Sequence, residues 1–259
     1  MKMIEVNHLR FKYRKNDKAV LNDLSFGVER GTVNVLIGLN GSGKTTLIKT
    51  LAGLLDGYSG EILIDGKDLS QIKIPDRAKI VSYVAQRNGT IDDFLVREYL
   101  LFARVGRLHF YESPRAIDER EMEKCAERFG FTHLLNKRLG EISGGERQIV
   151  SICSAILQDT DIVILDEPTS ALDIKNQHMV LSIIKSIATE RDKTFVLSSH
   201  NPNHALFLES NVILLQDGKI SISGPSSEII TPSTLKTVYG DSLCLSCELP
   251  YKEVSFKAN

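Results

Sequence analysis

The stretch Gly38-Leu39-Asn40-Gly41-Ser42-Gly43-Lys44-Thr45 is the strongest indication of the fold, because it matches the phosphate-binding pattern G-x-x-x-x-G-K-[S/T]. An apolar strand-like segment, residues 32–37, precedes the match, and a helical pattern over residues 45–55 follows it. In such a loop the backbone N–H groups converge on phosphate oxygens, so side chains must be absent where the chain wraps most tightly. The following helix presents its N-terminus to the anion. This order of elements predicts a nucleotide-binding site.

Two side chains of this loop have chemistry that phosphate transfer needs. We expect Lys44 to reach the β- and γ-phosphates and the Thr45 hydroxyl to bind Mg²⁺. The ordinary alternative, a glycine turn with a solvated lysine, is disfavoured by the flanking strand and helix. A dinucleotide fingerprint G-x-G-x-x-G is excluded, because Thr46 stands where the third glycine is needed. The residues expected to bind nucleotide here are Gly38, Asn40, Gly41, Ser42, Gly43, Lys44, Thr45 and Thr46.

Composition limits the class of protein. The 259 residues are 42% hydrophobic and 25% charged, which is close to globular averages and argues against disorder. The net charge of −1 argues against a strongly basic nucleic-acid binder, so no nucleic-acid partner is expected. No apolar run approaches the roughly 18 residues of a membrane span, and no signal peptide is apparent, so we expect a cytoplasmic protein. Four cysteines are too few for a disulfide scaffold of this size.

A second acidic segment lies further along the chain. The apolar residues 162–165 end in Asp166 and Glu167. A buried parallel strand would deliver both carboxylates to the carboxyl edge of the sheet, where α/β folds bind ligands. We expect Asp166 to lie near Mg²⁺ and Glu167 to act as general base on the attacking water. The alternative is an acidic N-cap for the next helix, and it loses weight beside the phosphate loop.

Strand and helix patterns alternate at both ends of the chain, which predicts a parallel sheet covered by helices. Residues 92–140 are mostly helical and interrupt this alternation as an insertion. The expected strands are 3–13, 20–28, 32–37, 80–84, 162–165 and 194–198, with hairpins over 60–69 and 211–222 and further helices over 149–157 and 177–189.

The heptapeptide Ile142-Ser143-Gly144-Gly145-Glu146-Arg147-Gln148 closely resembles the signature motif of ATP-binding cassette (ABC) ATPases, L-S-G-G-Q/E, with Ile142 in place of leucine. Its serine precedes Asp166 by 23 residues, as the family pattern expects. The small residues stand before an apolar helical run, so this is a second helix N-terminus suited to an anion, and Ser143 would also cap it. In the family this motif faces the nucleotide of a partner subunit. The resemblance therefore implies that Ser143, Gly144 and Gly145 bind nucleotide in a head-to-tail dimer.

Other family elements follow in order. Tyr13 resembles the aromatic that stacks on adenine, and Gln86 resembles the Q-loop glutamine, a catalytic and metal-binding residue. Asp173 resembles the D-loop aspartate, and His200 the switch histidine that contacts the γ-phosphate. Each has an ordinary structural interpretation on its own, and their order favours the functional one. For His204 the sequence suggests only a structural role.

The resemblance implies an α/β fold: a P-loop NTPase core with a parallel sheet, an N-terminal antiparallel β subdomain and an inserted α-helical subdomain at about residues 90–142. The ATPase domain would span residues 1–230, and residues 231–259 would form a less patterned tail. Cys244-x-x-Cys247 in this tail lacks the second pair or nearby histidine that a zinc site needs.

Segments around residues 95–99, 103–107, 134–138 and 200–205 resemble importer ATPases for iron chelates and cobalamin. This implies an ATPase that energises uptake of a metal chelate such as iron–siderophore, haem or cobalamin. Its partners would be a second ABC subunit in a homodimer, a transmembrane permease and, indirectly, an extracytoplasmic substrate-binding protein. It would attach to the cytoplasmic face of the membrane, with ATP and Mg²⁺ as cofactors. The alternative is a soluble ABC ATPase of the iron–sulfur assembly type without a permease.

Overall fold

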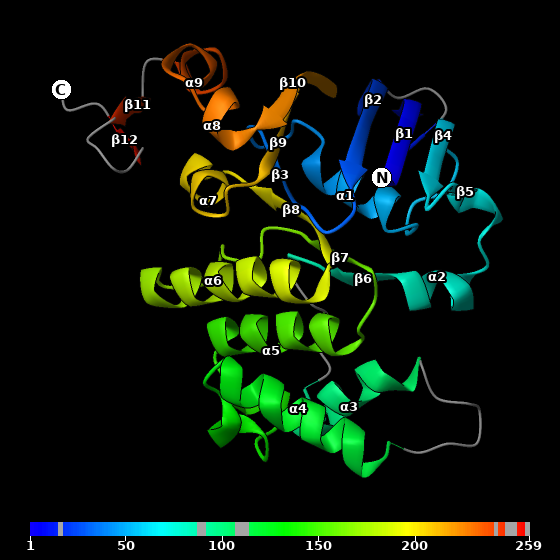
Figure 1. Cartoon of the computed structure of the whole chain (residues 1–259), viewed down its shortest axis with the longest axis vertical. Helices are drawn as coiled ribbons and strands as arrows, with labels where there is room; N and C mark the ends of the chain where they lie inside the picture. Colours follow the sequence, from blue (N-terminus) through cyan, green and yellow to red (C-terminus); the bar gives the residue numbers. More distant parts are fainter. Residues whose placement is uncertain (15–17, 87–91, 107–113, 241–242, 247–252, 257–259) are drawn as a thin grey trace.

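The computed structural model describes the chain except residues 15–17, 87–91, 107–113, 241–242, 247–252 and 257–259 (Figure 1). Its centre is a six-stranded sheet with strand order β10-β9-β3-β8-β7-β6. The strands from β9 to β6 run parallel, and β10 pairs antiparallel with β9. The predicted α/β core is confirmed. Its strands are β3 (Val33–Ile37), β6 (Val81–Val84), β7 (Ile162–Leu165), β8 (Thr194–Ser199), β9 (Asn211–Gln216) and β10 (Lys219–Pro225).

Helices cover both faces of this sheet, so every residue of β3, β7 and β8 is buried. Side chains alternate between the faces with the two-residue period of a strand. Val35 packs into the core shared with α5 (Gly144–Leu157) and α6 (Ile174–Arg191), whereas Leu36 packs into the core shared with α1 (Lys44–Leu51). The phosphate loop therefore joins a strand and a helix that pack against each other in one core.

Helix boundaries differ from the predicted ones for local reasons. Helix α1 ends at Leu51, before the predicted residue 55, because Gly53 adopts a left-handed φ of 68° that stops a helix. Helix α6 begins at Ile174, before the predicted residue 177, because Asp173 caps it by accepting a hydrogen bond from the backbone N–H of Asn176.

A second, antiparallel sheet lies on the α1 side, in the order β2-β1-β4-β5 (Figure 1). It is the predicted N-terminal β subdomain. Its inward residues share one core with α1. The strands are β1 (Lys2–Phe11), β2 (Leu21–Glu29), β4 (Ser59–Ile64) and β5 (Lys67–Asp68).

Helices α3 (Val96–Val105) and α4 (Ala116–Arg128) pack beside α5 and lie far from the antiparallel sheet in Figure 1. A disulfide joins Cys125 on α4 to Cys153 on α5. The cysteine count did not predict this pairing, because it depends on how two helices meet. Among the described helices, none has the length and apolar character to cross a membrane. The shorter helices are α2 (Ile74–Ile80), α7 (Pro202–Phe207), η1 (Leu69–Gln71), η2 (Thr132–Leu134) and η3 (Leu139–Glu141).

The C-terminal tail is more regular than its sequence predicted. It forms α8 (Ser226–Ile229), α9 (Pro232–Tyr239) and a hairpin of β11 (Leu243–Ser246) and β12 (Glu253–Phe256). The missed signal was a Thr-Pro helix start, because Thr231 caps α9 and proline suits the first helical position. Cys244 lies in β11, and Cys247 lies outside the described residues.

Candidate active site

The phosphate loop runs from the end of β3 to the start of α1. Two of its glycines have backbone angles that favour glycine, with φ of 81° at Gly41 and 106° at Gly43. A side chain at Gly38 would collide with the carbonyl oxygen of Leu215. Gly43 is the N-cap of α1 and offers no side-chain cap, so the first N–H groups of the helix remain available to an anion.

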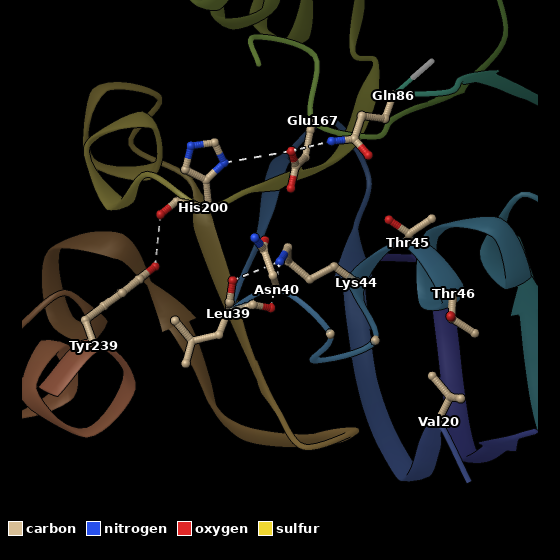
Figure 2. Close-up of a pocket in the computed structure, with 13 residues that line it drawn as sticks. Val20, Leu39, Asn40, Lys44, Thr45, Thr46, Gln86, Glu167, His200 and Tyr239 are labelled. Carbon is tan, nitrogen blue, oxygen red and sulfur yellow. Dashed lines mark hydrogen bonds and ion pairs between the residues drawn. The ribbon is translucent and has the colours of Figure 1, made fainter. Parts of the chain in front are cut away.

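This loop forms one wall of a cavity of about 700 Å³ (Figure 2). Val20 and Thr46 lie at one end, and Gln86, Glu167 and His200 lie at the other. The cavity thus has room for an extended ligand with its phosphates along the loop. The full lining is Val20, Gly38, Leu39, Asn40, Gly41, Gly43, Lys44, Thr45, Thr46, Gln86, Glu167, His200 and Tyr239.

Lys44 is buried, with 6% of its surface exposed. Its ammonium donates hydrogen bonds to the carbonyl oxygens of Gly38 at 2.8 Å and Leu39 at 3.0 Å. Burial lowers the pKa of Lys44, while the nearby negative charges of Glu167 and Asp166 oppose that shift. A phosphate oxygen at the loop would be a stronger partner than these neutral carbonyls, because both groups would then be charged.

The two carboxylates at the end of β7 have different surroundings. Asp166 is 1% exposed, and its Oδ1 accepts hydrogen bonds from the hydroxyls of Ser198 at 2.7 Å and Thr45 at 3.3 Å. Glu167 instead points into the cavity (Figure 2), where its Oε2 accepts a hydrogen bond from Nε2 of Gln86 at 2.8 Å and lies 3.8 Å from Nδ1 of His200. One acid is thus held for binding, and the other faces the space where a water could react.

The backbone of Glu167 is strained. Its φ is 47°, a left-handed value that non-glycine residues seldom adopt and that costs of order 1–3 kcal/mol. The Ser198 hydroxyl accepts its N–H at 2.8 Å, and the Ser170 hydroxyl donates to its carbonyl at 3.0 Å. These bonds hold the strained turn, which separates the directions of two consecutive acidic side chains.

The oxygen donors at the loop fit Mg²⁺. Thr45 supplies a hydroxyl and Asp166 a carboxylate, 3.3 Å apart, beside the phosphate-binding wall. Mg²⁺ commonly uses one or two such protein oxygens, with substrate phosphates and waters completing its shell. In the part of the chain that the structure describes, no group of three or more His, Cys, Asp or Glu residues could hold a metal by itself. A magnesium ion here would therefore depend on the phosphates.

Tyr13 lies beside the cavity and is 57% exposed. Its hydroxyl is 3.2 Å from the hydroxyl of Thr46, which lines the cavity, and its ring stands edge-on to Phe11 at 5.1 Å. This places an aromatic surface next to the end of the cavity that is farther from Glu167.

Ser143, Gly144, Gly145 and Asp173 do not line the cavity of this single chain. Ser143 caps α5: its hydroxyl accepts a hydrogen bond from the N–H of Glu146 at 3.3 Å, and its own N–H donates to the Glu146 carboxylate at 2.8 Å. That backbone hydrogen bond lowers the pKa of Glu146. The predicted capping role of Ser143 is confirmed, and Asp173 likewise serves as the cap of α6.

Tyr239 was not among the predicted site residues, because the tail showed no pattern that pointed to the cavity. Its hydroxyl donates to the carbonyl oxygen of His200 at 3.1 Å (Figure 2). His204 packs behind the same turn, with Nδ1 2.9 Å from the Ser199 hydroxyl. Burial, and secondarily the charge of His200, lowers the pKa of His204 to about 4, so this ring is neutral at neutral pH, in line with its predicted ordinary role.

A glycine loop for phosphates beside the acidic end of a neighbouring strand is the device shared by P-loop nucleoside triphosphatases, and the fold and site together define that class. Residues 21–170 match the sequence profile described as ABC transporter. The chain belongs to the ABC transporter family. As a member of this family it is an ATPase that couples ATP hydrolysis to transport.

Named relatives match nearly the whole chain. A Helicobacter pylori protein named "Probable iron chelatin transport ATP-binding protein" is 33% identical over 242 residues, covering 93% of this chain and 94% of that protein. The ferric enterobactin transport ATP-binding protein of Escherichia coli is 31% identical over 221 residues, covering 85% of this chain and 82% of that protein. A structure described as an inward-facing metal-chelate type ABC transporter matches with a TM-score of 0.82 and 25% identity, over 99% of this chain and 97% of that one.

Proposed function

We propose that this chain energises an importer for a metal chelate such as an iron–siderophore complex, haem or cobalamin. The observation that carries the proposal is the 33% identity over nearly the full length to a protein named for iron chelatin transport. The named relatives offer no support for an iron–sulfur assembly factor, because both are transport ATP-binding proteins.

The test is purification of the tagged chain from membranes in mild detergent, followed by uptake of a labelled ferric siderophore into vesicles. We expect a polytopic membrane protein to copurify, and uptake to require ATP. Recovery of the chain only from the aqueous fraction, with no polytopic partner, would favour the assembly alternative.

We assign the hydrolytic roles from the geometry of the cavity. The N–H groups of the loop and the Lys44 ammonium bind the phosphates, and the Glu167 carboxylate accepts a proton from the attacking water. Gln86 orients that carboxylate through its 2.8 Å hydrogen bond, and His200 lies close enough to reach the γ-phosphate. Thr45, Asp166 and Gln86 would hold Mg²⁺, which when bound offsets charge on the phosphates. Tyr13 would stack on adenine.

The residues left outside the cavity support a homodimer. Ser143, Gly144, Gly145 and Asp173 resemble nucleotide-binding motifs, yet none of them lines the cavity of its own chain. A head-to-tail arrangement of two copies would bring them to the partner's nucleotide, which gives two ATP sites per dimer. This accounts for a helix N-terminus at α5 that faces no ligand within one chain.

The permease is proposed to dock on the helical segment. Phe94 and Phe102 stack edge-to-face at 5.3 Å and remain 38% and 56% exposed, and Val105 beside them is 46% exposed. Apolar side chains that are exposed and adjoin one another are candidates for a protein contact surface. We assign this surface to a cytoplasmic segment of the permease, so that the chain sits on the cytoplasmic membrane face. An extracytoplasmic substrate-binding protein would then act only through the permease.

Phe102→Asp tests this docking. We expect it to abolish copurification of the permease while the isolated chain hydrolyses ATP at the wild-type rate. Retention of the permease by this variant would contradict the assigned surface.

A further inference from the structure

The C-terminal tail returns to the active site and contacts the His200 turn directly. Tyr239, the last residue of α9, lines the nucleotide cavity and donates its hydroxyl hydrogen to the carbonyl oxygen of His200 at 3.1 Å (Figure 2). Burial raises the pKa of Tyr239 to about 12, so the hydroxyl keeps its proton and remains a donor at neutral pH. The contact joins residues 39 positions apart in the sequence.

Helix α9 is anchored firmly enough to hold this tyrosine. Leu235 and Val238 on the same helix are 2% and 6% exposed and belong to the main core. Thr231 fixes the start of the helix by accepting a hydrogen bond from the N–H of Thr234. The position of Tyr239 is therefore determined by packing.

The tail makes a second contact at the other end of the same turn. The side-chain amide of Asn203, on α7, donates to the carbonyl oxygen of Val254 at 2.9 Å and accepts from its N–H at 2.8 Å. Val254 lies in β12 and is 7% exposed. The tail thus holds the short stretch from His200 to Asn203 at both ends.

Among the described residues, no hydrogen bond restrains the ring of His200. It is 60% exposed, and its Nδ1 lies 3.8 Å from Glu167, which is beyond hydrogen-bond distance. The distance of the ring from Glu167 and from a γ-phosphate therefore depends on where the His200 backbone lies, and the hydrogen bond at its carbonyl helps to hold that backbone.

We propose that Tyr239 is a positioning residue for His200, through which the C-terminal segment sets the rate of ATP hydrolysis. The inference rests on the role proposed above for His200. The family profile matches residues 21–170, and Tyr239 lies outside that stretch.

The first test is Tyr239→Phe in the full chain, which removes only the hydroxyl. We expect kcat for ATP to fall about two- to tenfold, the size of effect that one neutral hydrogen bond can have, with KM unchanged and the thermal midpoint lowered by no more than a few degrees. Tyr58→Phe is the matched control, because the Tyr58 hydroxyl is buried without a partner among the described residues and Tyr58 does not line the cavity. Wild-type kcat in Tyr239→Phe would overturn the inference.

The decisive test places the same change in a His200→Ala background and measures single-turnover hydrolysis. If Tyr239 acts through His200, the residual rate of His200→Ala is unchanged by Tyr239→Phe. A further loss of similar size would show that Tyr239 acts elsewhere and would overturn the inference. A His200→Ala variant with full activity would instead contradict the role proposed for His200.

Asn203→Ala provides a second route, because it releases Val254 and leaves Tyr239 intact. We expect a smaller loss of kcat than in Tyr239→Phe, again with KM unchanged. A rise in KM with kcat unchanged would mean that the tail affects nucleotide binding and would contradict the inference.

Discussion

The starts of α1 and α5 are both glycine-rich, but they differ in how their N–H groups are used. Helix α1 begins after Gly43, has no side-chain cap and opens onto the cavity. Helix α5 begins after Ser143, which forms a reciprocal cap with Glu146, and no residue of its start lines the cavity. An uncapped helix end binds phosphate through its backbone, whereas a capped end contributes mainly a hydroxyl and small, closely approachable residues. In the head-to-tail dimer proposed above, one chain would therefore contribute two unlike halves to two different ATP sites.

The largest effect on ATP hydrolysis is expected from a change at Glu167, the proton acceptor in the cavity. Glu167→Gln removes the proton acceptor and should lower kcat by about 10²–10⁴-fold while ATP binding persists. Turnover and equilibrium binding of a fluorescent ATP analogue measure the two quantities. Full hydrolysis by this variant would contradict the role of Glu167. Glu209→Gln, an exposed glutamate paired with Lys185, serves as the control.

The two helix starts should respond differently to charge. Lys44→Ala should raise Kd for ATP by about 10–100-fold in the single chain, because a charge-assisted contact to phosphate is lost. Gly144→Asp should leave this Kd and the fold unchanged, since a side chain at Gly144 meets nothing within 4 Å in its own chain. It should still reduce turnover about tenfold or more, because the new carboxylate would oppose the partner's phosphates.

Gly106→Asp is the matched control for Gly144→Asp, because a side chain at Gly106 also meets open space. It should hydrolyse ATP at the wild-type rate. Unchanged turnover in Gly144→Asp would contradict the proposal that the start of α5 contacts the partner's nucleotide.

Mixing Lys44→Ala with Gly144→Asp, at an ATP concentration where each variant alone hydrolyses slowly, tests whether the two helix starts meet across subunits. In a head-to-tail dimer, Lys44→Ala paired with Gly144→Asp places both defects in one site and leaves the other intact. Equal mixing should therefore restore about a quarter of the wild-type rate, because half the dimers are mixed and each has one working site. No recovery over either variant alone would indicate sites completed within one chain.

The smallest effect concerns the cap itself. Ser143→Ala should lower the free energy of unfolding by about 1 kcal/mol, the usual contribution of an N-cap hydroxyl. Urea unfolding followed by circular dichroism measures it. Ser143→Thr keeps a hydroxyl at this position and should recover most of the loss. Equal stability of Ser143→Ala and the wild type would show that Glu146 alone satisfies the helix start.

Much of the fold was predictable because its signals are local. The glycines of the phosphate loop, the apolar run before Asp166 and the serine before α5 each specify geometry within a few residues. The tail was predicted poorly because α9 is short and its apolar residues reveal their role only when they pack against the core. The disulfide between Cys125 and Cys153 was missed for the same reason, since it depends on how α4 meets α5.

Short ordered motifs in the sequence suffice to predict a phosphate-binding α/β ATPase of the ABC family, because they encode the required glycines, acids and caps. Which of these residues share a cavity depends on how the chain packs and could be seen only in the folded protein. Gln86 and Glu167 are 81 residues apart, and Tyr239 and His200 are 39 apart, yet each pair is hydrogen-bonded. Such contacts follow from how strands are ordered in the sheet and how the tail packs, which no local pattern specifies.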